Sequence, residues 1–519
     1  MAAGSKGKGT KAQGGVSGGL DSAAPEAWKR PKGLKKRHMT TILALLPLLL
    51  VLGLLASGRA SALVAGLVGL SATLAASAVI VTGTRGGDVL AGLFLHETAA
   101  GSWLAWHVIA IIAAGMFFHR CQQARGAVAN GGALEANPRR LWSVCFLLAP
   151  FAESVTGFGV GYIIALAALR RLGLNGMSAL LLGLYSQSLV PWGALATGTT
   201  VGATLAGLTP NELGLSSALL QIPIHALYLG LYWRFAREAG FATSVAQKID
   251  DAVWTALLLG LIWLANRFTD VEIAGAAPTA FLLAVRFWRD ERPDATRLKS
   301  ALHANAPYVA LTLALCATRL VPPLRDLLKP LWAMRPFEGQ PAFAPLYAPG
   351  FWLVSIGIVT VWLARASLGR VLVETGRGAW RSCAVTLLFV VMAQFYVGSG
   401  MAETIAEALR AVAGRGSAMS VPMFAAVGGF LTGGGSAANA MLMPMVTALA
   451  RAITVDPAWI AAVQNSVCTN LTMLSPIRVS MGAAILALPA VESALYRRAW
   501  PLALPPLLVG FATILVLLA

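Results

Sequence analysis

The chain has 519 residues, of which 57% are hydrophobic and only 12% are charged, and its mean hydropathy is +0.71. Soluble domains carry roughly twice that share of charged residues, so the composition excludes an ordinary soluble enzyme or binding domain. The formal net charge is +18, but the basic residues lie between apolar segments and do not form a surface for nucleic acid. The sequence therefore predicts an all-α polytopic membrane protein with no nucleic-acid partner.

The first 39 residues form a basic tail ahead of the first apolar segment. The tail is rich in glycine, serine and lysine, and its acidic residues are only Asp21 and Glu26. It lacks the apolar side chains that a folded core needs, so we expect it to be disordered. Because basic segments are retained on the cytoplasmic side, we expect a cytoplasmic N-terminus that contacts anionic membrane lipid.

Apolar segments follow from residue 41 to the end of the chain. Many exceed the length that crosses ~30 Å of hydrocarbon at ~1.5 Å per residue. Several are too long, or too interrupted by glycine and proline, to form one simple span, so we expect about 12 crossings plus re-entrant hairpins. In chain order the segments are 41–57, 60–82, 101–118, 141–169, 177–208, 213–233, 252–268, 272–288, 305–321, 346–364, 380–398, 418–450, 458–487 and 499–518.

Two halves of the chain repeat the same pattern of polar interruptions. In the first half, FAESVTGFG from Phe151 precedes a helical stretch and then a second polar break, YSQSLVP, up to Pro191. In the second half, FLTGGGSAANA from Phe430 precedes a helical stretch and then QNSVCTNLTMLSP up to Pro476. Carriers often arise from inverted duplications whose substrate site lies where broken helices meet.

The repeat predicts four regions along the chain. They are the tail at 1–39, a first transmembrane repeat at 40–240 with a hairpin around 141–160, connecting helices and a cytoplasmic loop at 241–300, and a second transmembrane repeat at 301–519 with a hairpin around 418–440. The proline-rich segment 335–349 is expected to be an extracytoplasmic loop.

The polar breaks contain the groups that a small anion needs. Free backbone N–H groups at the N-terminus of a half-helix stabilise a carboxylate, and nearby amides and hydroxyls could bind further oxygens. The alternative is that the small residues serve only close helix packing. The candidate substrate-binding residues are Thr156, Gly157, Gly159, Tyr162, Gln187, Ser188, Gly435, Ser436, Asn439, Asn465, Asn470 and Arg478.

Two charged residues carry the mechanistic hypothesis. Glu153 lies in an apolar segment, where burial disfavours the charged form, so it is the proton-coupling candidate. The alternative is a carboxylate that pairs permanently with a basic group, Arg478 being one option. Arg478 could bind a substrate carboxylate bidentately, or it could be a basic helix end that faces the cytoplasm.

An enzyme would require a nucleophile with a nearby base, or a metal cluster. Outside the basic tail, the sequence contains no GxSxG, no HExxH and no paired acid and histidine within one polar segment. Its five cysteines are scattered singly, without the spacing of a disulfide framework or a metal site. We therefore expect a carrier and not an enzyme, with no cofactor and no metal.

The polar motifs together resemble the L-lactate permease family. EsvTGFG at 153–159 is similar to the family's EGATGFG, VPWGA at 190–194 to its PVSFGA, and FLTGGGSAANA at 430–440 to its FLTGSDTSSNA; QNSVCTNLTMLSP at 464–476 is similar to its QNTGG followed by GKMISP. The motifs occur in the family's order, and the resemblance covers most of residues 40–519.

The resemblance implies a bacterial inner-membrane protein that takes up lactate or glycolate together with protons. It also implies two inverted repeats with re-entrant hairpins and a transport domain that moves in the manner of an elevator; a homodimer is left open. The chain departs from the family in VGYII after TGFG, in GGGSAAN, and in SPIR at 475–478. Sodium-coupled transport of another organic anion, such as a dicarboxylate, is therefore the alternative function.

Overall fold

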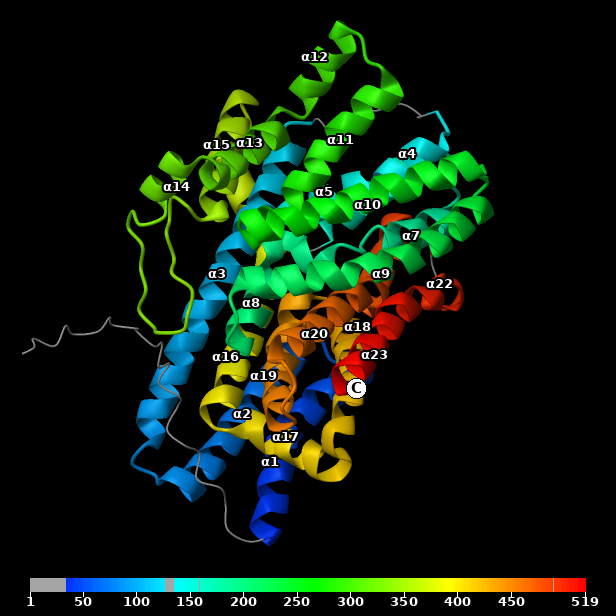
Figure 1. The fold of residues 1–519 in the computed structure, drawn as a ribbon. Helices are drawn as coiled ribbons and strands as arrows, with labels where there is room; N and C mark the ends of the chain where they lie inside the picture. The colour runs from blue at the N-terminus through cyan, green and yellow to red at the C-terminus, as the bar shows by residue number, and fades with distance from the viewer. Residues whose placement is uncertain (1–33, 127–134, 158, 489) are drawn as a thin grey trace, which may run out of the picture.

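The computed structural model describes residues 34–126, 135–157, 159–488 and 490–519 (Figure 1). Within these ranges the regular structure is helical, apart from one isolated β-bridge between Met334 and Phe343. This confirms the all-α prediction. Most of the basic tail, up to residue 33, and Phe158 of the TGFG motif lie outside the described residues.

Long helices that could cross a membrane occur throughout the described part of the chain. Eight are long and apolar enough, and there are up to ten if two bent helix pairs are each counted as one span. This is fewer than the expected number of about 12, because glycine and proline divide several apolar segments into short helices. The protein is a multi-pass membrane protein.

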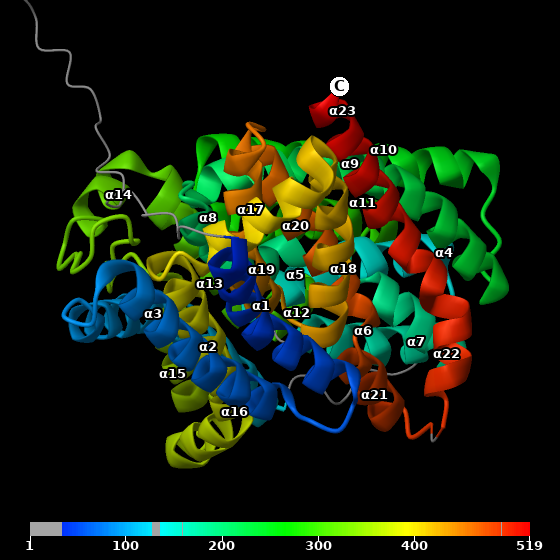
Figure 2. The ribbon, with the colours of Figure 1, turned by 90° about the horizontal axis from the view of Figure 1, so that it is seen from below.

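Three helices open the fold. They are α1 (Leu34–Ala56), α2 (Ala62–Arg85) and α3 (Leu90–Ala124). In Figure 2, α2 and α3 lie on the opposite side from α22 (Glu492–Ala499). The long α3 packs along α16 (Leu368–Gly398) and α15 (Pro349–Leu363), so distant parts of the chain form one wall.

The first repeat is a series of helices with two interruptions. The apolar stretch predicted at 141–169 is divided, because Gly157 adopts a φ of 69° that ends one helix and Gly159 a φ of 83° before the next. The helices are α4 (Pro138–Ser143), a π-helical turn (Val144–Leu148), α5 (Ala149–Thr156), α6 (Val160–Arg171), α7 (Gly176–Tyr185), a 3₁₀ turn (Val190–Trp192), α8 (Gly193–Ala206) and α9 (Pro210–Glu238).

The connecting region is also helical. Its elements are α10 (Val245–Phe268), a 3₁₀ turn (Val271–Ile273), α11 (Ala276–Glu291), α12 (Ala295–Ala304), α13 (Ala306–Leu320) and α14 (Pro322–Leu328). The proline-rich segment 335–349 is confirmed as a loop up to the start of α15. The side of the membrane on which it lies stays a prediction.

The second repeat follows the order of the first. After α17 (Met401–Ala413) come a 3₁₀ turn (Gly414–Ser420), α18 (Val421–Thr432), α19 (Gly435–Ala452), α20 (Pro457–Leu471), a 3₁₀ turn (Thr472–Leu474), α21 (Pro476–Ile485), α22, a 3₁₀ turn (Trp500–Ala503) and α23 (Leu504–Leu518). Thus α5–break–α6 corresponds to α18–break–α19, and α7–break–α8 corresponds to α20–break–α21.

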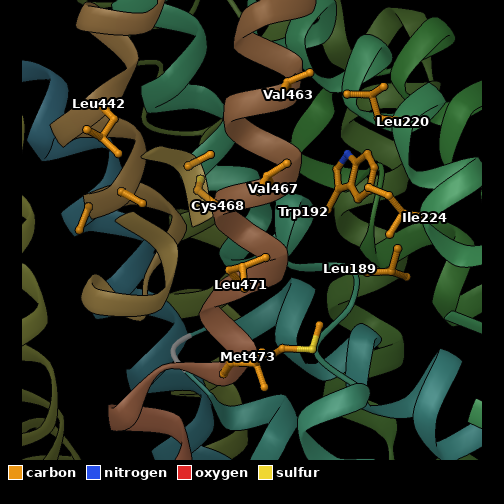
Figure 3. Packing of buried hydrophobic residues seen from close by; sticks show 14 of the residues in the cluster. Leu189, Trp192, Leu220, Ile224, Leu442, Val463, Val467, Cys468, Leu471 and Met473 are labelled. Atoms are coloured by element: carbon orange, nitrogen blue, oxygen red, sulfur yellow. The ribbon is translucent and has the colours of Figure 1, made fainter. Parts of the chain in front are cut away.

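The two repeats share one apolar core. Helix α20 packs against α18, α19 and α9. Figure 3 shows Val463 and Val467 of α20 facing Leu220 of α9, with Trp192 of the first-repeat break alongside. Because these apolar surfaces bury one another, the interruptions of both repeats are held in the interior of the protein.

Candidate functional site

Glu153 lies in the last turn of α5, just before the glycine break, and its side chain is only 4% exposed. The chain reverses at the break, so backbone N–H groups point back toward the carboxylate. The N–H of Gly159 donates to Oε1 at 3.2 Å, and the N–H of Gly161 donates to Oε2 at 3.1 Å. Hydrogen bonds to a carboxylate offset part of the cost of burying its charge.

Gly161 has no room for a side chain at this position. A Cβ there would lie 2.6 Å from the Cβ of Glu153 and 2.8 Å from its backbone nitrogen. A glycine is therefore required for α6 to pack closely enough against α5 to hydrogen-bond the carboxylate.

Arg478 belongs to α21 in the second repeat and is also buried, at 6% exposure. Its Nη2 donates to Oε1 of Glu153 at 3.2 Å, and its Nη1 donates to the side-chain oxygen of Gln187. The helix that carries it begins at Pro476 and is capped by Ser475, whose hydroxyl accepts from the N–H of Arg478. Arg478 therefore joins the first break of the first repeat, the second break of the first repeat and the second break of the second repeat.

Glu153 and Arg478 line one cavity of about 580 Å³. Volumes of this order are typical of small-molecule sites. The N-terminus of α19 also faces the cavity, through Gly434, Gly435, Ser436 and Ala437. The N-cap residue, Gly434, has no side chain to cap that end of α19, so the first N–H groups and the positive dipole of α19 are directed at the cavity. Six of the candidate residues line this cavity: Glu153, Gly157, Gly159, Gly435, Ser436 and Arg478.

Asn439 and Asn465 lie behind the cavity wall and are fully buried. The amide nitrogen of Asn439 donates to the carbonyl of Gly198 at 2.9 Å and to the side-chain oxygen of Asn465 at 2.8 Å. The amide nitrogen of Asn465 donates to the hydroxyls of Thr199 and Ser217. In this arrangement the two asparagines bind protein groups and join α19, α20, α8 and α9.

The remaining candidates also lie outside the cavity lining. The Thr156 hydroxyl donates to the carbonyl of Ala152, and the Asn470 amide donates to the carbonyl of Ser466, each within its own helix. Ser188 pairs with the ring of His225 at 3.2 Å. Tyr162 packs tightly against Gly482. Gln187 reaches the site through Arg478.

Sequence reasoning missed several polar groups of the site. Thr432 and Thr197 line the cavity, and the hydroxyl of Ser436 donates to that of Thr197 at 3.3 Å. Thr197 lies in the ATGTT stretch at 196–200, one residue after the VPWGA motif. A run of small polar residues that follows a helix break is the pattern that indicates it.

The fold and this site define a class: a multi-pass helical membrane protein with a buried carboxylate–guanidinium pair in a cavity between two pairs of broken helices. Residues 288–518 match the sequence model of the L-lactate permease family. The L-lactate permease of Streptococcus iniae is 22% identical over 451 residues, which are 81% of this chain and 93% of that protein. These findings support a divergent member of the L-lactate permease family, as the motifs predicted, and indicate a transporter and not an enzyme.

The comparison with solved structures includes the YdaH transporter of Alcanivorax borkumensis. The alignment covers 86% of this chain and 96% of that chain, at 14% sequence identity and a TM-score of 0.45.

Proposed function

We propose that the protein is a secondary active transporter that takes up a small monocarboxylate, a 2-hydroxy acid such as lactate or glycolate, together with a proton. It would lie in the bacterial inner membrane with its N-terminus in the cytoplasm. A transport domain that contains the broken helices of both repeats, 40–240 and 301–519, would move against a scaffold in the manner of an elevator and so alternate access to the site. The observation that carries the proposal is the pairing of Glu153 with Arg478 in the cavity wall.

The pair provides a physical reason for coupling. An isolated charge buried in a protein costs several kcal/mol, so Arg478 requires an anionic partner in every stable state. Without substrate that partner is Glu153. If a proton neutralises Glu153, Arg478 can instead bind the carboxylate of the substrate, assisted by the N-terminus of α19.

The charge balance then favours only two states of the site. The empty site has Glu153 ionised, and the loaded site has Glu153 protonated with one substrate carboxylate beside Arg478. Counting the buried pair of Glu153 and Arg478 alone, both states are electrically neutral, whereas a substrate anion beside an ionised Glu153 leaves one excess negative charge on the pair; the exposed Arg381 also lines the cavity. One proton therefore accompanies one monocarboxylate, and transport is electroneutral.

Sodium-coupled transport of another organic anion is the alternative function. It would need converging oxygen ligands for the cation, and the hydroxyls of Thr197, Thr432 and Ser436 line the same cavity. Purified protein in lipid vesicles distinguishes the two. We expect labelled lactate to accumulate under an inward proton gradient without sodium. Accumulation that requires sodium, or that occurs only with dicarboxylates, would contradict the proposal.

A further inference from the structure

A second and larger cavity, of about 1410 Å³, is not used by the site described above. Its walls come from α3, α15, the first part of α16 and the loop that precedes α15. The indole N–H of Trp103 donates to the carbonyl of Pro341 at 3.0 Å and fixes that loop against α3. The lining is mostly apolar, and its charged residues are the acidic Asp270, Glu272 and Asp326 and the basic Lys329 and Arg335.

Thr197 lines both cavities, and it is the one residue that their described linings share. Its side chain is 4% exposed, and the hydroxyl of Ser436 donates to it from α19. Next to it, α8 and α19 approach so closely that a Cβ on Gly198 would lie 3.0 Å from the carbonyl carbon of Gly435. A thin layer of small residues thus separates the two cavities.

The backbone immediately before Thr197 is strained. Ala194, Leu195 and Ala196 have φ values of 48°, 52° and 59°, which places three successive residues with a Cβ in the left-handed region. Residues with a Cβ rarely adopt this conformation, because the Cβ then lies too close to the following carbonyl oxygen. Strain of this kind clusters at active sites, ligand clamps and switch regions. Relaxation of these residues would rotate or displace Thr197 relative to α19.

We propose that the larger cavity is the second compartment of the substrate pathway. Thr197, which accepts a hydrogen bond from Ser436, is the partition between this compartment and the smaller cavity that Glu153 and Arg478 line (the Arg478 site). The inference rests on the proposed function, because it assigns a route to the same substrate. A small anion released from Arg478 would pass Thr197 when the strained segment relaxes, and would leave through the larger cavity.

The test is to fill the larger cavity without touching the Arg478 site. Two residues, Thr200 of α8 and Val354 of α15, line the larger cavity but not the smaller one. Val354 is 37% exposed, so a larger side chain can be accommodated there. The variants are Thr200→Trp and Val354→Trp. The matched control is Thr204→Trp, one turn further along α8, because Thr204 lines neither cavity. Lactate binding to purified protein and lactate exchange in vesicles are both measured.

We expect each cavity-filling variant to lower the exchange rate roughly tenfold or more while the lactate Kd stays within about twofold, because only the path is obstructed. Thr204→Trp should leave both quantities near the wild-type values. Wild-type exchange rates in both cavity-filling variants would overturn the inference and leave the proposed function standing. A wild-type protein that neither binds nor transports any monocarboxylate would overturn the proposed function as well.

The partition itself is tested by Thr197→Ala, which removes the hydroxyl that Ser436 contacts. We expect faster passive efflux of lactate from preloaded vesicles without a proton gradient, and a lower steady-state accumulation with one. Thr204→Ala is the control. Efflux and accumulation equal to those of the control would mean that Thr197 does not separate the compartments.

Discussion

The guanidinium of Arg478 lies 3.2 Å from the carboxylate of Glu153, although 325 positions separate the two residues in the sequence. The pair connects the broken helix of the first repeat to that of the second. It also places two opposite charges beside the N-terminus of α19 in one cavity. Both functions proposed for these residues, proton coupling and anion binding, therefore depend on the same contact.

Replacing the carboxylate of Glu153 tests whether this residue couples proton movement to lactate transport. Glu153→Gln should abolish proton-driven accumulation of lactate but retain exchange of internal for external lactate, because the amide mimics the protonated acid and leaves Arg478 available. Accumulation and exchange are measured in vesicles with and without an imposed pH gradient. If Glu153→Gln still accumulates lactate against its gradient, Glu153 does not carry the proton and the pair is structural.

Replacement of the arginine tests the anion site. Arg478→Gln should reduce the apparent affinity for lactate by roughly tenfold or more, since a charged hydrogen bond is worth about 1.5–3 kcal/mol. Arg478→Lys should recover part of the affinity, because it restores the charge without the planar fork of donors. Binding titrations of the purified variants measure this, and wild-type affinity in Arg478→Gln would remove the residue from the substrate site.

The same pair makes a prediction about stability. Arg478→Gln leaves Glu153 buried without its cation, so we expect a loss of about 3–5 kcal/mol if the acid stays ionised. The double variant Glu153→Gln with Arg478→Gln should be more stable than Arg478→Gln alone. Thermal unfolding of the purified variants measures the difference. If the stability lost in the double variant equals the sum of the losses in the two single variants, the contact between Glu153 and Arg478 contributes nothing to stability.

The asparagine network predicts unequal effects for two residues of the same type. Asn439→Ala removes the amide that joins α19 to α8 and α20, and leaves buried partners without hydrogen bonds, so we expect destabilisation of about 1–3 kcal/mol. Asn470→Ala is the matched control, since the amide of Asn470 donates within α20 alone. Melting temperatures of the purified variants compare them. An equal or larger loss for Asn470→Ala would contradict the assigned role of the network.

Close packing of the second hairpin against α20 gives a further stability prediction. A Cβ at Gly429 would overlap the backbone carbonyl of Cys468, whereas a Cβ at Gly230 of α9 has nothing within 4 Å. Gly429→Ala should therefore prevent stable folding or lower the melting temperature strongly, because a backbone atom cannot move aside easily. Gly230→Ala should be neutral or stabilising by up to about 1 kcal/mol. A stable, monodisperse Gly429→Ala protein would contradict the packing of α18 on α20.

The sequence by itself determined the class of protein and the position of its helix breaks. Long apolar segments require helices, since each helix satisfies its own backbone hydrogen bonds in lipid. The glycines after Glu153 and before Gly435 interrupt those helices because they have no Cβ and adopt a positive φ. The order of the polar motifs also indicated the family. All of these properties are local along the chain.

Only the tertiary structure decided which polar groups meet. Asn439 and Asn465 were expected to bind substrate, but they hydrogen-bond each other and neighbouring helices, and Thr197 was not selected although it lines both cavities. Composition and spacing cannot distinguish a polar residue that lines the cavity from one that bonds to a neighbouring helix. Burial requires each polar group to have a hydrogen-bond partner, but it does not specify which partner. The partner depends on how α8, α19, α20 and α21 pack, and that packing brings residues hundreds of positions apart into contact.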